Sequence, residues 1–138
     1  MTIQNLTHTM HAEHMVIKEL ISELGNHNLL THEGRQKLLV LEDLLINHLQ
    51  MEETQFYPLL YQLSQHQPTA NHIVQSLHQS TCPLSMDMLY FFQQLHNQEE
   101  EPAVLQNHFA TIVTTFHERM ALEEYQLMEL LNQLAQAE

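Results

Sequence analysis

The sequence predicts an all-α protein, and three observations favour this class. Only two glycines and four prolines occur in 138 residues. Leucine, glutamine, glutamate and methionine, which are all strong helix formers, are abundant in the segments between these residues. Apolar residues recur every three or four positions in four segments, and no stretch alternates apolar and polar residues as a half-buried strand does. We therefore expect four helices in one domain that spans residues 1–138.

The first helix is expected over residues 3–24, where the first apolar stripe lies. Gly25 and Asn26 follow it, and both residue types commonly close a helix. A loop is then expected to about Thr31, before the next stripe begins.

The second helix is expected to carry a stripe over residues 38–63 that includes Leu59 and Leu63. Pro58 lies inside this stripe. Because proline lacks the backbone N–H and clashes with the preceding turn, we expect a kink or break near Tyr57.

The third helix is expected to begin near Pro68, since proline suits the first position of a helix. Its stripe includes Ile73, and Pro83 should bend it. The acidic stretch 97–101 forms the next turn, and the fourth helix covers residues 105–134. Four long helices with short loops predict an up-down-up-down antiparallel four-helix bundle.

Composition excludes several classes of function. Seventeen acidic and four basic side chains give a formal net charge of −13, which disfavours nucleic acid and anionic membranes as partners. No apolar run is long enough for a transmembrane helix, and no signal peptide is visible. Cys82 is the single cysteine, so no intrachain disulfide can form and a cytoplasmic location is expected.

Polar residues interrupt the apolar stripe of the second helix. His48 and Glu52 are four residues apart, so they lie about 40° apart on a helix of 3.6 residues per turn, in the middle of the apolar face. A carboxylate in a core is costly unless it is paired, protonated or bound to a cation.

The other three helices repeat this feature. His14, His78 and Glu123 each lie among apolar neighbours, so each helix directs a histidine or a glutamate toward one level of the bundle. A single core histidine is usually a hydrogen-bonded structural residue, and a single buried glutamate usually pairs with a base. The chain has only four lysines and arginines, however, to pair with buried glutamates. Imidazole with carboxylate suits iron, zinc or manganese. The pattern predicts a metal site in the core.

Residues 48–58, HLQMEETQFYP, resemble the second-helix motif of hemerythrin-like (HHE) domains, in which a histidine precedes two glutamates, an aromatic residue and a proline. Glu13 and His14 resemble the first-helix signature, His78 fits the third-helix histidine, and Glu123 with Glu124 resembles the fourth-helix motif. The resemblance covers residues 10–131. It implies a non-haem di-iron centre that binds or senses oxygen or nitric oxide, or that serves iron homeostasis or repair. The metal ligands that we expect are His14, His48, Glu52, His78, His117 and Glu123.

Arg119 departs from the family pattern, because it occupies the position that corresponds to His48. An arginine has no free lone pair and cannot bind a cation. His117 could replace it if a π-bulge rotates the helix, with Glu118 or Glu124 as the carboxylate partner. Alternatively, Arg119 forms an ion pair with the glutamates, and the site holds one metal ion or none.

Three classes of function follow from these alternatives. The first is a metal-binding protein whose further ligand is a small diatomic molecule. The second is a metal-free, acidic interaction module that binds a basic protein or forms a homodimer. The third, an enzyme, has little support, because the chain has no phosphate-binding loop or nucleophile motif. Cys82 lies one turn after His78 and is a weak further ligand candidate.

Overall fold

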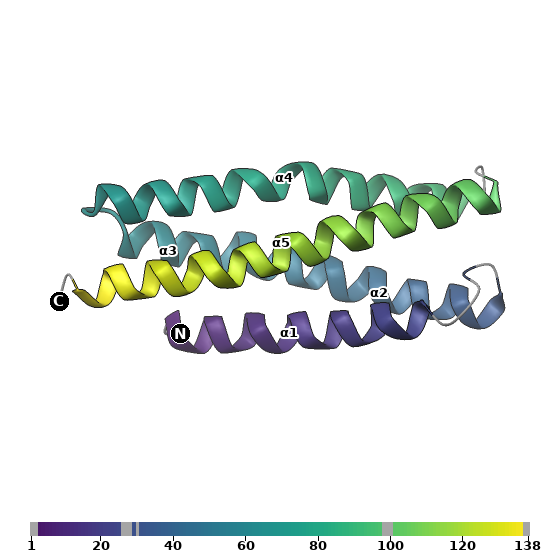
Figure 1. The fold of residues 1–138 in the computed structure, drawn as a ribbon, viewed down its shortest axis with the longest axis horizontal. Coiled ribbons are helices and arrows are strands. Elements are labelled where there is room, and N and C mark those ends of the chain that lie inside the picture. The colour runs from purple at the N-terminus through teal and green to yellow at the C-terminus, as the bar shows by residue number, and fades with distance from the viewer. Residues whose placement is uncertain (1–2, 26–28, 30, 98–100, 137–138) are drawn as a thin grey trace.

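The computed structural model describes residues 3–25, 29, 31–97 and 101–136, and this part of the chain is helical without any strand (Figure 1). The all-α class is therefore confirmed. None of the described helices is long and apolar enough to cross a membrane. The elements in chain order are α1 (Ile3–Leu24), α2 (His32–Met51), a π-helical segment η1 (Glu52–Phe56), α3 (Tyr57–Leu63), α4 (Pro68–Asn97) and α5 (Pro102–Gln136).

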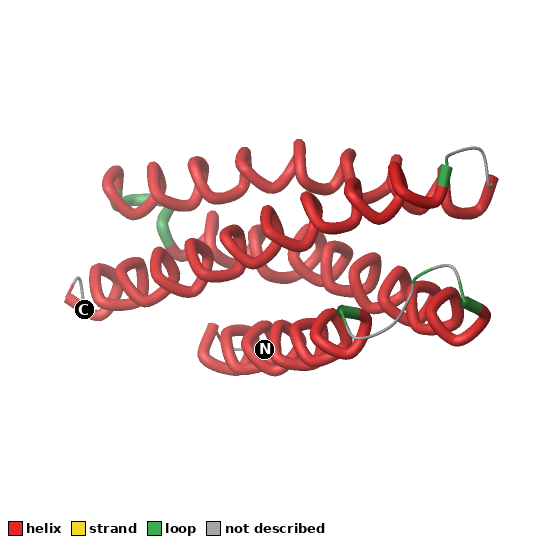
Figure 2. Tube along the Cα trace, turned by 45° about the vertical axis from the view of Figure 1, so that its right-hand side comes forward, coloured by secondary structure: helices red, strands yellow, loops and turns green. Residues whose placement is uncertain are grey.

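Four helical rods lie side by side, because α2, η1 and α3 follow one another without a break. α1 packs against α2, and α4 packs against α5. Figures 1 and 2 place the connection between α3 and α4 at one end of the molecule. The end of α1, the start of α2, the end of α4 and the start of α5 lie at the other end.

The irregularity predicted near Tyr57 is the π-helical segment η1, in which the Tyr57 N–H donates to the carbonyl of Glu52, five residues earlier. The wide turn lies directly before Pro58, which has no N–H to continue an α-helical ladder. Because the turn contains an extra residue, it rotates the helix that follows. Tyr57 and Leu60 therefore enter the core, whereas Leu63 is 40% exposed, so its predicted core position was wrong.

The third rod begins at Pro68 as predicted, and Pro83 lies inside α4. Its buried face differs from the predicted one by a residue, because Val74 rather than Ile73 is fully buried. The expectation for the turn 97–101 lies mostly outside the described residues, as does the one for the Cys82 side chain.

The core consists of two hydrophobic clusters. One contains residues such as Ile17, Leu45 and Phe116, and the other contains Leu6, Phe56 and Leu127 among others. Buried polar side chains occur in the sequence between the members of these clusters on every rod. We call the following group the polar layer: His14, His48, Glu52, Thr81, Arg119 and Glu123.

Candidate metal centre

A buried group of histidine and glutamate side chains at the polar layer could hold a metal ion. His14 comes from α1, His48 from the last turn of α2, Glu52 from the start of η1 and Glu123 from α5. Each residue offers a ligand atom, and these atoms all lie within 4.8 Å of one another. Nitrogen and oxygen ligands bind zinc at about 2.0–2.2 Å, so twice the bond length is close to the widest separation in the group.

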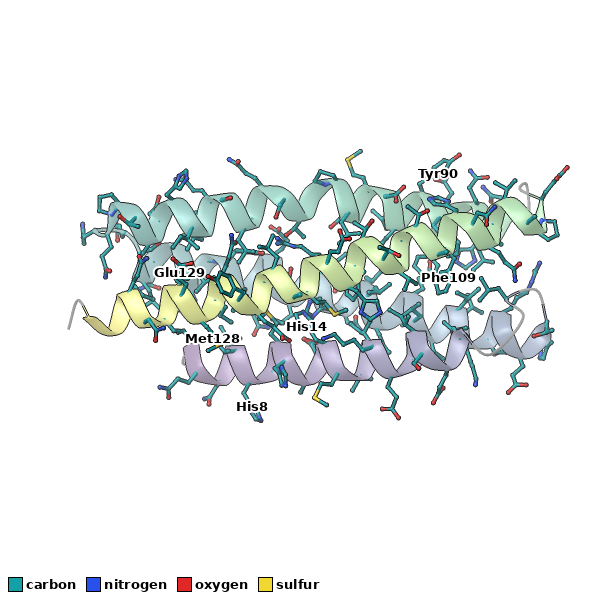
Figure 3. The ribbon with its side chains drawn as sticks, in the orientation of Figure 1. His8, His14, Tyr90, Phe109, Met128 and Glu129 are labelled. Atoms are coloured by element: carbon teal, nitrogen blue, oxygen red, sulfur yellow. The ribbon has the colours of Figure 1, made fainter. Side chains whose placement is uncertain are left out.

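The predicted convergence of polar residues from different helices is therefore confirmed for these four residues. Their side chains are 1–3% exposed. Figure 3 shows His14 between α1 and α5, whereas His8, on the same helix, points away from the molecule.

Two carboxylates outside the group orient its histidines. Nδ1 of His14 lies 3.1 Å from Glu124, and Nδ1 of His48 lies 3.2 Å from Glu13. We assign the ring proton of each neutral histidine to Nδ1, because a carboxylate can only accept there. Both Nε2 lone pairs then face inward, and these two nitrogens are 3.2 Å apart. A carboxylate on the outer ring nitrogen is the usual support of a metal-binding histidine.

The inner carboxylates carry buried oxygens that lack hydrogen bonds. Oε1 of Glu52 lies 2.7 Å from Nε2 of His48, and Oε1 of Glu123 lies 3.5 Å from Nε2 of His14. Neither oxygen has a hydrogen-bond partner of acceptable geometry. Inward lone pairs on nitrogen and unsatisfied carboxylate oxygens form a donor set that a divalent cation would satisfy, so the residues fit a bound metal.

Without a metal, protons stabilise this arrangement. Burial raises the pKa of Glu52 to about 8, and the charge of Glu123 contributes to the rise. Burial by itself would lower the pKa of His48, but Glu13, Glu52 and Glu123 together raise it to about 10. Burial by itself would raise the pKa of Glu123, but its interactions with His14, Glu52 and Arg119 hold it below the usual range of a glutamate. The metal-free site therefore retains protons that a cation would displace.

Arg119 provides a fixed positive charge beside the group. Its Nε lies 3.5 Å from Oε2 of Glu123, which supports the predicted ion pair with a glutamate. The guanidinium also donates to the Tyr57 hydroxyl at 2.9 Å and to the Leu77 carbonyl at 2.6 Å. Further hydrogen bonds reach the hydroxyls of Ser80 and Thr81. Arg119 thus occupies the space between the group and α4.

Comparison of the chain with protein-family models, with curated proteins and with solved structures finds no match.

His78 lies outside this group of four residues. Its ring stacks on Tyr57, with centroids 4.4 Å apart, and its nitrogens contact the Tyr61 hydroxyl and Glu53 at 2.9 and 2.8 Å. Its side chain is 31% exposed. The reason is the face of α4: Thr81, rather than His78, points into the polar layer.

His117 is also outside the group, because it lies on the exposed face of α5. The described part of α5 contains no π-helical turn that would rotate this histidine inward. Among the three candidate carboxylates of α5, Glu123 enters the group, Glu124 supports His14 from outside, and Glu118 is exposed.

Sequence reasoning missed the roles of Glu13, Tyr57 and Thr81. Glu13 directly precedes His14, but a position next to a ligand does not show that its carboxylate reaches across to α2. Tyr57 reaches Arg119 only because η1 turns it inward, and a helical wheel of constant period cannot show such a turn.

Proposed function

We propose that the protein is a hemerythrin-like metal-binding bundle of up-down-up-down antiparallel topology whose core binds one divalent transition-metal ion. The ligands would be His14, His48, Glu52 and Glu123. The observation that carries this proposal is the group of four buried donor residues within 4.8 Å, in which both imidazoles are oriented by outer carboxylates.

The donor set favours iron, zinc or manganese over soft copper(I), and the resemblance to hemerythrin-like domains favours iron. One ion fits better than a di-iron pair, because Arg119 lies where a second ion would need ligands from α4, and His78 and His117 point elsewhere. An iron ion held by these four residues would supply an open coordination position for a small diatomic molecule. The chain itself would orient the ligands through Glu13 and Glu124 and exclude water through the two hydrophobic clusters.

A metal-free interaction module remains a second candidate, and the ion pair of Arg119 with Glu123 favours it. In this case Arg119 and the proton of Glu52 would neutralise the core without a metal. The acidic surface, with a formal net charge of −13 for the chain, would then bind a basic protein.

Metal titration of the His48→Ala variant tests the proposal. We expect the parent protein, purified without a histidine tag and stripped of metal, to gain thermal stability with Fe²⁺ or Zn²⁺. His48→Ala should lose that gain, because it removes a nitrogen ligand and leaves Glu13 without its partner.

His96→Ala is the matched control, because His96 is an exposed histidine that also pairs with a glutamate, Glu42, at 2.9 Å. It should behave as the parent does. Equal stabilisation of all three proteins by metal would contradict the assignment of His48.

A further inference from the structure

A surface cavity lies between α2, η1 and α4, close to the polar layer. Its volume is about 400 Å³. Ile46, Leu49 and Leu89 provide most of its apolar lining, and Glu53, Thr81 and Ser85 are among the polar residues around it. A cavity of this size and lining suits a small, mostly apolar molecule.

A much smaller void lies among the four metal-ligand residues. Its volume is about 10 Å³, which is near the minimum for one water molecule, so a further ligand of a bound ion would also need space on the side of the surface cavity. Leu49 and Thr81 line both this void and the cavity outside it. Among the described side chains, these two therefore form the wall between the surface cavity and the proposed metal site.

The two side chains of this wall differ in how freely they can move. The Thr81 hydroxyl donates to the Leu77 carbonyl at 3.2 Å, accepts from Arg119 and lies 3.3 Å from the Tyr57 hydroxyl. Leu49 is only partly buried and packs by apolar contacts alone. A rotamer change of Leu49 would open the wall without breaking a hydrogen bond, whereas a movement of Thr81 would break several.

We propose that this cavity admits a small uncharged molecule to the metal site and that Leu49 is the gate. The inference rests on the proposed function, because it assigns the route by which the further ligand of the ion arrives. The apolar lining disfavours charged molecules, and the net charge of −13 disfavours anions in particular.

A second cavity provides an internal control. It lies between α1 and α2, has a volume of about 410 Å³ and includes Val16, Ile17 and Leu44 in its lining. Glu13, which contacts His48, also lines it, but none of its described lining residues lines the void at the proposed metal site. The two cavities therefore match in size, and only the first shares described lining residues with the void.

Xenon binding tests the cavity in the metal-free protein. Diffraction from crystals under xenon pressure should show xenon beside Leu49 in the parent, and no xenon there in Leu89→Trp, because the indole fills the cavity. Leu89 is 57% exposed, so its replacement leaves the core intact. Xenon bound only in the α1–α2 cavity, or in neither cavity, would overturn the proposal.

Nitric oxide association tests the gate in the Fe²⁺-loaded protein, after iron has been quantified in every variant. Leu49→Ala should speed association several-fold, and Leu89→Trp should slow it several-fold. Val16→Trp, which fills the other cavity at a side chain that is 51% exposed, should leave the rate unchanged. Equal rates for Leu89→Trp and Val16→Trp would overturn the proposal. If the protein binds no iron, the metal-binding proposal fails. The xenon experiment then tests only whether the cavity beside Leu49 takes up a small apolar molecule.

Discussion

At the scale of single residues, Arg119 determines how charge is balanced in the core. It is 7% exposed and combines an ion pair to Glu123 with hydrogen bonds to Tyr57 and α4. Removing a buried guanidinium with so many partners costs much of the free energy of folding. The residue therefore provides a permanent positive charge beside the Glu123 carboxylate.

Arg119→Met should destabilise the metal-free protein by about 3–5 kcal/mol, because Glu123 would remain buried without its cation. Added Zn²⁺ should reduce the loss, since the ion supplies positive charge to the same carboxylate. Urea unfolding of both proteins, with and without Zn²⁺, measures the two effects.

Arg35→Met is the control for that experiment, because Arg35 lies on α2 and is only partly buried. We expect it to change stability by less than about 1 kcal/mol. A loss in Arg119→Met that is no larger than this would show that Glu123 does not depend on Arg119.

The raised pKa values of Glu52 and His48 make metal-free stability depend on pH. The folded protein holds an extra proton on Glu52 between pH 4.5 and about 8, and on His48 between pH 6.5 and about 10. Because the folded state binds more protons than the unfolded state, stability should fall as pH rises through this range. The urea midpoint of the metal-free protein should therefore be lower at about pH 9 than at about pH 6.

Glu52→Gln serves as the control for this pH dependence, since it removes one of the two groups and keeps the shape of the side chain. The slope of stability against pH should become shallower. A metal-free parent that gains stability toward alkaline pH would contradict the assignment of the protons.

At the scale of elements, the π-helical segment determines which side chains surround the site. Glu52 begins η1. It follows His48 by four residues, so the two side chains lie on the same face of the helix. After the wide turn, Tyr57 and Leu60 occupy the core. The segment thus keeps Glu52 beside His48 and brings the Tyr57 hydroxyl to Arg119.

Pro83 differs from Pro58, because it lies inside α4 and no π-helical segment precedes it there. Pro83→Ala should stabilise the protein by at most about 3 kcal/mol, the cost of proline in a helix interior. The gain is reduced by the greater freedom of the unfolded chain. Thermal or urea unfolding checks this.

Pro68→Ala is the matched control, since Pro68 occupies the first position of α4, where proline is favourable. It should give no gain in stability. If both variants gained equally, the effect would not come from the interior position of Pro83.

At the scale of the whole molecule, the sequence was sufficient for the helical class and for four residues of the polar layer. A histidine or glutamate within an apolar stripe stands out because burying it is costly, and His14, His48, Glu52 and Glu123 were found in this way. A helical wheel of constant period then predicted the wrong buried face after η1, because the π-helical turn contains an added residue. It also failed on α4, where His78 was chosen although Thr81 points inward.

The support of the site could not be predicted, because it depends on contacts between helices. Glu13 is in α1 yet holds a histidine of α2, and Glu124 is in α5 yet holds His14 of α1. Such contacts follow from how the rods are placed against one another. The sequence carries no local signal for them.

Metal content tests the central claim most directly. The chain should be purified anaerobically without a histidine tag, since a tag would add to its twelve histidines. Mass spectrometry should then find one metal ion per chain, lost in His48→Ala and kept in His96→Ala. Absence of metal, after reconstitution with Fe²⁺, Zn²⁺ and Mn²⁺ has also failed, would contradict the proposed site and favour the metal-free bundle.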